Sequence, residues 1–287
     1  MKIVVTGGTG FAGKRVLSLL QGRGQIRCVT RDSEHFPIIE KQGFEPILAD
    51  VKSKASLLQA FRGCEGLINI VSLGFGDAEN IVQAAEEAGI LRAIFVSTTA
   101  VETRLNAKSK MLRLGAEEVI KKSKLKWTLL RPTMIYGGQD DRNIFRLLRL
   151  IRKMPLLFVP GSGEFLQQPV HVEDVAWAIV NAFFEKTTIE KTYNVSGAEA
   201  ISFNQLIRET CQALGVKRML WHLPITPVLW VCCMLEKFLA KPFLKEEQVL
   251  RLLEDKKFSN EEAHRDFGYT PRTFKEGILQ MVHSCLY

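Results

Sequence analysis

Short apolar runs alternate with longer stretches of helical periodicity through the first half of the chain. The apolar runs cover residues 2–6, 26–30, 44–49, 66–71, 93–97 and 127–131. The helical stretches between them include residues 14–21, 55–61, 77–88 and 108–122. Strands that are nearly all apolar, with helices between them, are typical of a parallel sheet covered by helices on both faces. The pattern therefore predicts an α/β fold with a Rossmann-type, doubly wound parallel sheet.

The pattern changes after Pro132, where strands become short and helical periodicity dominates. We expect helices at residues 143–153, at 173–184 and from about residue 202, a short strand at 193–195, and mostly helix from about residue 219 onward. We interpret this part as a smaller, α-rich C-terminal substrate region packed beside the C-terminal edge of the sheet. The expected division is residues 1–165 for the cofactor domain and residues 166–287 for the second region, partly interleaved with the first.

The first apolar run leads directly into a glycine-rich loop, TGGTGFAG at residues 6–13, which opens the first helix. In such a loop the first glycine permits a tight turn, the second lets the backbone approach a pyrophosphate, and the third allows close packing of helix on strand. The helix N-terminus adds amide donors and a positive dipole. This context favours a dinucleotide site over a turn that only joins two elements. The predicted contacts are Gly7, Thr9, Gly10, Phe11, Ala12 and Gly13.

The end of the second apolar run indicates which dinucleotide binds. Arg31 stands at the tip, where NAD-binding chains usually carry an acidic residue. A guanidinium can bind a 2′-phosphate with two hydrogen bonds, so NADP(H) is favoured. Asp32 and Glu34 keep NAD(H) open, and an exposed loop arginine without a ligand is the third interpretation. The remaining predicted cofactor contacts follow the next apolar runs and are Asp50, Val51 and Val71.

Further segments follow the TGGTGFAG loop in a fixed order: FVSTT at residues 95–99, WTLLRPTMIYG at 127–137, PVHVEDVA at 169–176, YNVSG at 193–197 and FGYTPR at 267–272. Together they resemble the short-chain dehydrogenase/reductase superfamily, and specifically its extended and atypical branches. The C-terminal part is similar to the group of the nucleotide-binding accessory subunit of respiratory complex I. The resemblance implies an NAD(P)(H)-binding, epimerase/dehydratase-like or reductase-like protein.

The resemblance also implies a catalytic pattern: a Ser or Thr after the fifth strand, then a Tyr-x-x-x-Lys pair in which the lysine lowers the pKa of the proton-transferring tyrosine. Ser97 and Thr98 match the first part. The chain's tyrosines lack a lysine four places later; they are Tyr136, Tyr193, Tyr269 and Tyr287. Counting back from Trp127 puts Ser109 at the tyrosine position and Arg113 at the lysine position. A serine without an adjacent base is too weak an acid for this role, although Arg113 can still bind ribose hydroxyls. We therefore expect a degenerate catalytic set.

Candidates for substrate contacts lie in the second half of the chain. Tyr136 follows the sixth strand, near the edge of the sheet where ligands bind in such folds, although packing is its favoured role. His171 is either a structural residue before a helix or a catalytic or substrate-contacting one. Asp140 and Asp141 are expected to cap the following helix. The third substrate candidate is Arg146, on that basic helix.

The net charge of +8 has two candidate locations, Arg31 and the helix at residues 142–153. Arg142, Arg146, Arg149 and Lys153 recur there at helical spacing. This face can be solvated, can bind an anionic substrate such as a nucleotide diphosphate or acyl-CoA, or can contact anionic lipid or an acidic partner. The apolar stretch at residues 224–240 is either core packing or a lid, or a membrane or subunit contact. Basic residues are dispersed without a recognition motif, so no nucleic-acid partner is expected.

The composition, 46% hydrophobic and 24% charged, excludes a disordered, collagen-like or coiled-coil chain. Six cysteines without a CxxC pair predict free thiols in a reducing cytosol and no metal site. The N-terminus has no signal-peptide pattern, and the uncharged stretch at residues 219–235 contains Pro224 and Pro227. Neither secretion nor a spanning helix is therefore expected. We expect a cytoplasmic protein, with a peripheral place at the inner membrane as the alternative.

Two functions stay open. The first is an NADP(H)-binding, epimerase-like atypical protein that acts on an unknown small molecule or keeps only weak redox chemistry. The second is a catalytically inactive, nucleotide-bound structural or regulatory subunit of a membrane-associated complex. In that case the cofactor would stabilise the fold by mass action, and partners would bind the basic and apolar C-terminal helices.

Overall fold

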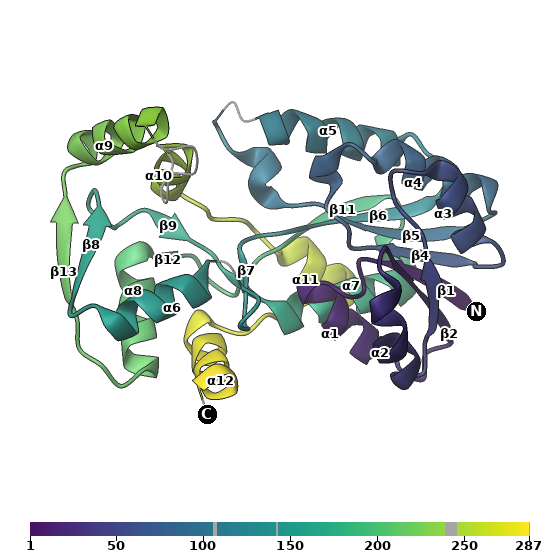
Figure 1. Ribbon diagram of the computed structural model, residues 1–287, viewed down its shortest axis with the longest axis horizontal. Coiled ribbons are helices and arrows are strands. Elements are labelled where there is room, and N and C mark those ends of the chain that lie inside the picture. Colours follow the sequence, from purple (N-terminus) through teal and green to yellow (C-terminus); the bar gives the residue numbers. More distant parts are fainter. Residues whose placement is uncertain (106–107, 142, 239–245, 287) are drawn as a thin grey trace. The chain divides into compact units, whose positions relative to one another are not determined.

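The computed structural model describes residues 1–105, 108–141, 143–238 and 246–286 (Figure 1). The chain forms two units that are interleaved along the sequence. The first unit contains Met1–Thr133, Val172–Val195 and Ser259–Thr270; the second contains Met134–His171, Ser196–Phe258 and Pro271–Tyr287. The boundary expected at residue 165 falls inside the second unit, because the chain returns to the first unit after both His171 and Phe258.

The first unit is built on a seven-stranded sheet in the order β11-β6-β5-β4-β1-β2-β3, and every neighbouring pair is parallel. The strands are β1 (Lys2–Thr6), β2 (Gln25–Thr30), β3 (Glu45–Leu48), β4 (Gly66–Asn69), β5 (Arg92–Val96), β6 (Lys126–Pro132) and β11 (Lys191–Val195). The central strands are buried on both faces, as the continuous apolar runs require. Because β1 lies between β2 and β4, the sheet is wound in both directions from it. The predicted Rossmann-type, doubly wound fold is confirmed.

Helices cover both faces of this sheet (Figure 1). One face carries α3 (Lys54–Phe61), α4 (Ala78–Glu87) and α5 (Lys108–Lys121); the other carries α1 (Phe11–Leu20), α2 (Phe36–Lys41), α7 (Val172–Phe184) and α11 (Glu261–Phe267). The α3–α5 layer buries Phe61, Ile81 and Ile120 against Phe95 and Leu129 of the sheet. Short 3-10 helices η1 (Ser33–His35), η2 (Leu73–Phe75) and η3 (Thr99–Glu102) follow β2, β4 and β5, and η4 (Lys186–Thr188) follows α7.

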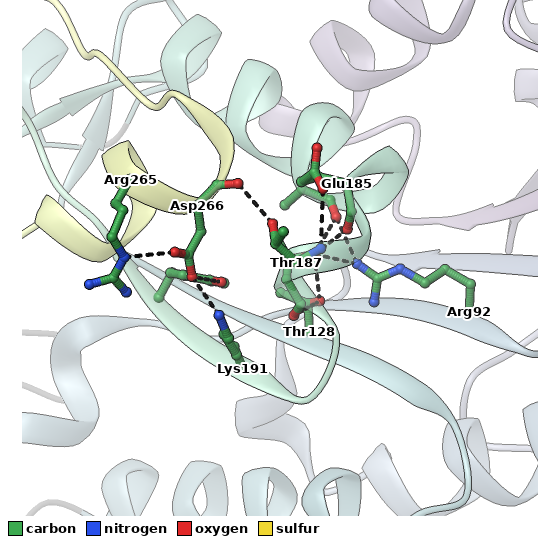
Figure 2. A network of polar contacts seen from close by, with 10 residues as sticks. Arg92, Thr128, Glu185, Thr187, Lys191, Arg265 and Asp266 are labelled. Carbon is green, nitrogen blue, oxygen red and sulfur yellow. Dashed lines mark hydrogen bonds and ion pairs between the residues drawn. The ribbon is translucent and has the colours of Figure 1, made fainter.

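Arg92, at the start of β5, fixes the end of α7 to the sheet (Figure 2). Its guanidinium donates hydrogen bonds of 2.7–3.1 Å to the carbonyl oxygens of Lys126, Ala182 and Phe183 and to Oγ1 of Thr188. Burial lowers the pKa of Arg92 to about 10. Ala182 and Phe183 lie in the last turn of α7, whose carbonyl oxygens have no partner inside the helix, so this arginine supplies donors for them.

Asp266 fixes α11 to the edge strand β11, which is distant from it in sequence (Figure 2). Its carboxylate accepts hydrogen bonds from Nζ of Lys191 at 2.8 Å, the hydroxyl of Tyr193 at 2.7 Å and Nε of Arg265 at 2.9 Å. These donors hold the pKa of Asp266 well below its usual range, with Lys191 as the largest cause. Burial, followed by the Asp266 contact, raises the pKa of Tyr193.

The second unit combines short strand pairs with helices. The pairs are β7 (Ile135–Tyr136) with β10 (Val170–His171), β9 (Leu166–Gln167) with β12 (Ile201–Ser202), and β8 (Leu156–Pro160) with β13 (Met219–Leu223). The helices are α6 (Ile144–Lys153), α8 (Phe203–Ala213), α9 (Ile225–Phe238), α10 (Glu246–Leu253) and α12 (Phe274–Leu286). Asp141 caps α6 as expected, because its carboxylate accepts from the amides of Asn143 and Phe145. Within the described ranges, no helix is both long and apolar enough to cross a membrane.

The expectation of mostly helix from residue 219 onward is wrong at Met219–Leu223. This segment is a strand that pairs with β8 along its whole length. Its short apolar run has no clear period, and its partner lies far back in the sequence, so local periodicity does not indicate the pairing. Arg142, residues 239–240 and Tyr287, which the sequence analysis also names, lie outside the part of the chain that the structure describes.

Candidate functional site

The glycine loop makes the tight strand-to-helix turn that its sequence predicts. Gly7 has a φ of +75°, which side chains rarely adopt, and its carbonyl oxygen accepts from the amide of Gly10 at 3.1 Å. A Cβ atom at Gly13 would lie 2.1 Å from the oxygen of Gly7 and 2.7 Å from the backbone of Gly8. The first turn of α1 therefore packs directly on the loop backbone, and only glycine fits at this position.

The start of α1 has the features of an anion site. Gly10 is its N-cap residue, with extended backbone and no side-chain cap, and the first turn holds no acidic residue. The amide of Lys14 makes the first bond back to Gly10, so the amides of Phe11, Ala12 and Gly13 precede the intrahelical ladder. Thr9 is half-buried beside them. An exposed helix start of this kind can bind a phosphate through backbone amides and the helix dipole.

The loop after β4 lies against the glycine loop. A Cβ atom at Gly7 would lie 3.1 Å from the amide nitrogen of Val71. The hydroxyl of Thr6 donates to Oδ1 of Asn69 at 2.6 Å, and Nδ2 of Asn69 donates to the carbonyl oxygen of Val71 at 3.2 Å. Sequence reasoning missed Asn69. A polar residue at the end of an otherwise apolar strand would have indicated Asn69 as a site residue.

The residues after β2 include an exposed cation, Arg31, and a carboxylate with a local backbone partner, Asp32. Arg31 is exposed and makes no hydrogen bond or ion pair with any residue that the structure describes. Oδ1 of Asp32 accepts from the amide of Glu34 at 2.9 Å and so caps η1. After β3, Asp50 is exposed and accepts from the amide of Lys52 at 3.0 Å, while Val51 is buried. The parallel register brings all these positions to the carboxyl edge of the sheet, where this fold binds ligands.

The polar residues after β5 have structural partners. The hydroxyl of Ser97 donates to Glu117, which is buried on α5 and forms a two-pronged ion pair with Arg131 of β6. Thr98 caps η3 by accepting from the amide of Ala100 at 3.2 Å. Sequence reasoning missed the pairing of Glu117 with Arg131, because nothing local in either segment indicates the partner.

Ser109 and Arg113 lie one turn apart on α5, beside η2. Nη1 of Arg113 approaches the carbonyl oxygen of Ser109 at 3.5 Å. A Cβ atom at Gly74 of η2 would lie 3.1 Å from both Nε and Nη2 of Arg113. The guanidinium therefore rests on the loop that follows β4, the strand next to β1.

The substrate candidates of the second unit differ in exposure. Tyr136 and His171 are buried neighbours, with their ring centroids 5.3 Å apart and nearly perpendicular. The hydroxyl of Tyr136 lies 3.5 Å from the carbonyl oxygen of Phe274 of α12. Arg146 is exposed on α6. Buried aromatic packing favours a structural role for Tyr136 and His171, whereas Arg146 can meet a ligand. In the described part of the chain, no three His, Cys, Asp or Glu side chains form a cluster that could hold a metal ion.

Comparison with known proteins agrees with this geometry. Residues 7–186 match the sequence model of a family described as NAD(P)H-binding. The chain is 25% identical to a 2-alkyl-3-oxoalkanoate reductase of Stenotrophomonas maltophilia, across 99% of each protein. It is also 25% identical to the mitochondrial NADH dehydrogenase (ubiquinone) 1 alpha subcomplex subunit 9 of Mus musculus, across 86% of this chain and 70% of that protein.

Solved structures share the fold at low sequence identity. The UDP-glucose 4-epimerase of Thermus thermophilus in complex with NAD matches with a TM-score of 0.73 at 20% identity, covering 99% of this chain and 98% of that one. The residues matched by the family model include most of the glycine loop. This chain therefore belongs to the NAD(P)H-binding family and is an atypical, epimerase-like member of the short-chain dehydrogenase/reductase superfamily.

Proposed function

We propose that the protein binds NADP(H) in preference to NAD(H) and that Arg31 selects the 2′-phosphate. The observation that carries this proposal is the contrast after β2. Arg31 is exposed and unpaired among the described residues, whereas Asp32 already accepts a backbone amide within η1. A guanidinium can form two charge-assisted hydrogen bonds to a phosphate. In NAD-binding chains a carboxylate at this position binds the ribose 2′-hydroxyl instead.

The other cofactor contacts follow from the carboxyl edge of the first unit. The backbone at Gly10 and the free amides of the first turn of α1 fit a pyrophosphate, while Gly7 and Gly13 allow the tight turn and close packing that hold them in place. We assign Asp50, beside Val51, to the adenine amino group, and Val71 to the wall next to the Gly7 turn. Arg113 is assigned to ribose hydroxyls. A bound nicotinamide would supply the hydride donor or acceptor that the superfamily uses.

The proposed chemistry is reductase-like or epimerase-like, with a degenerate catalytic set of Ser97, Thr98, Ser109 and Arg113. The hydroxyl of Ser97 is engaged by Glu117, and that of Thr98 by a backbone amide. Ser109 has no adjacent base on α5, and the guanidinium of Arg113 does not release its proton near neutral pH. Proton transfer would therefore be slow unless the substrate brings its own acidic group.

For the substrate side we propose that Arg146 binds a negatively charged group of an unidentified small molecule. Tyr136 and His171 would shape this region through packing, because both side chains are buried. Lysine and arginine side chains on the same face of α6 add to the attraction of an anion.

A second candidate function is a nucleotide-bound structural or regulatory subunit without turnover. The observation that favours it is the engagement of Ser97 in a buried ion-pair cluster, together with the similarity to a complex I subunit. For both candidate functions we propose a cytoplasmic location. For the second function the protein would lie at the inner membrane, in contact with a complex.

Titration of the purified protein with NADPH and NADH tests the cofactor proposal. Assays of NADPH oxidation with carbonyl compounds and sugar nucleotides separate the two functions. Turnover with any of these substrates supports the first function. Tight NADPH binding without turnover, with co-purification of a membrane complex, supports the second. NADH binding as tight as NADPH binding contradicts the proposed cofactor.

A further inference from the structure

Strands β8 and β13 form a two-stranded sheet (Figure 1). One face of this sheet is apolar and exposed. Leu157 and Val159 of β8 are buried against the core of the second unit, so the alternate residues point outward. Phe158, Met219 and Trp221 are 55%, 73% and 59% exposed. Phe158 and Trp221 are directly paired in register, with ring centroids 6.2 Å apart. The outward positions are Leu156, Phe158, Pro160, Met219, Trp221 and Leu223, and none is polar.

Helix α9, which begins after Pro224, extends this apolar surface along the chain. Among its residues only Cys232 is buried, although the helix is apolar around most of its circumference. Trp230 and Phe238 are 64% and 81% exposed. Within the part of the chain that the structure describes, α9 is an apolar helix with most of its surface exposed, which is typical of an interaction surface.

Basic residues gather where the two strands begin. Arg152 and Lys153 precede β8, and Lys217 and Arg218 precede β13. Because the strands are parallel, both basic pairs lie at the same edge. The segments before the two strands are in contact, because Nε of Arg218 donates a hydrogen bond of 2.7 Å to the carbonyl oxygen of Ile151. The side chains of Arg152, Lys153 and Lys217 are exposed.

No acidic residue opposes this charge in the surrounding sequence. Residues 142–163 and 210–235 contain neither Asp nor Glu. Arg146 and Arg149 are further exposed cations on α6. The surface thus combines tryptophan and aliphatic side chains with an excess of positive charge, in which Glu236 near the end of α9 is balanced by Lys237. This composition is typical of surfaces that bind the headgroup region of an anionic bilayer.

We propose that this surface, defined by the outer face of β8 and β13, helix α9 and the basic residues Arg152, Lys153 and Lys217, docks on the surface of an anionic lipid bilayer. A lipid surface fits better than a folded partner, because the outward side chains of β8 and β13 offer no hydrogen-bond donor or acceptor that would specify a protein's polar groups. The aromatic rings insert at headgroup depth, and the cations attract acidic lipids. The contact is peripheral. It is independent of which cofactor the first unit binds.

Co-sedimentation of the full chain with vesicles tests this proposal. We expect binding to vesicles of phosphatidylcholine with phosphatidylglycerol, and at least about tenfold weaker binding to phosphatidylcholine alone, because each basic residue near the surface adds attraction. Binding should fall as salt rises. Phe158→Ser and the double variant Lys153→Glu/Lys217→Glu should each weaken it by about tenfold or more. Brominated lipids should quench tryptophan fluorescence of the bound wild-type protein.

Matched variants on the first unit serve as controls. Leu91→Ser removes another exposed apolar side chain, and Lys122→Glu reverses another exposed charge; neither should change vesicle binding. Unchanged melting temperatures and NADPH affinity would show that the test variants remain folded. The proposal is overturned if wild-type protein does not bind anionic vesicles, or if the controls lose as much binding as the test variants. It is also overturned if Phe158→Ser instead converts an oligomer into a monomer, since the face would then bind a second copy.

Discussion

The hydroxyl of Ser97 donates a hydrogen bond of 2.6 Å to Oε1 of Glu117. Glu117 is completely buried, and Arg131 contacts both of its carboxylate oxygens. Arg131 also reaches Glu102 at 3.2 Å, and these carboxylates keep its pKa high although burial opposes this. The serine that the superfamily pattern would make catalytic is therefore part of a buried ionic cluster that joins β5, α5 and β6.

We predict that Glu117→Gln destabilises the protein by about 2–3 kcal/mol, less than the ~3–5 kcal/mol of a fully buried pair, because Glu102 still partners Arg131. Ser97→Ala should cost only about 1 kcal/mol, the typical value of one hydrogen bond. Urea denaturation measures both. If Ser97→Ala abolished NADPH turnover while stability stayed unchanged, the structural role of Ser97 would be wrong.

Gly13→Ala should reduce NADPH affinity by at least about tenfold and destabilise the fold by about 1–3 kcal/mol, because its Cβ atom would overlap the loop backbone at Gly7. Gly115→Ala is the matched control. Gly115 lies in α5 with open space around its Cβ position, so this change should stabilise the protein by about 0.5–1 kcal/mol. Isothermal titration and thermal unfolding measure the two effects. Equal behaviour of the two variants would contradict the account.

The hydrogen bonds of Asp266 should make the protein less stable to unfolding in acid. Hydrogen bonds from Lys191, Tyr193 and Arg265 lower the pKa of Asp266 in the folded state. The stabilisation that Asp266 gives is therefore complete above the pKa of an aspartate in the unfolded chain, and it is lost as the pH falls below that value. Asp266→Asn should cost about 1–2 kcal/mol at pH 7, because the partners Lys191 and Arg265 are exposed and screened. The difference from wild type should shrink below about pH 4. A difference constant between pH 3 and 7 would refute this, and Glu199→Gln, an exposed change, should show none.

The sequence predicts the first unit well because its signals are local. Each apolar run before Pro132 becomes a strand whose ends lie within two residues of the expected ones. The glycine loop specifies its own turn, since Gly7 needs positive φ and Gly13 needs an absent side chain. Such features depend on neighbours in sequence, and periodicity or a motif can indicate them.

Other features depend on partners that are distant in sequence. The strand at Met219–Leu223 exists because β8 pairs with it, and α11 joins the first unit because Asp266 meets Lys191 and Tyr193. In the same way, Ser97 gains a structural role only through Glu117. A single sequence gives no information about which polar residues will meet, so the degenerate catalytic set could be named but its partners could not.

The affinity of the purified protein for NADPH and NADH, measured side by side, tests the central claim most directly. We predict that NADPH binds at least about tenfold more tightly, the effect of one charge-assisted contact to the 2′-phosphate. Arg31→Ala should abolish this preference while NADH affinity stays within about twofold of wild type, since Arg31 would contact only the extra phosphate. Lys122→Ala, another exposed cation, should leave both affinities unchanged. NADH binding equal to or tighter than NADPH binding, or equal weakening of both by Arg31→Ala, would contradict the account.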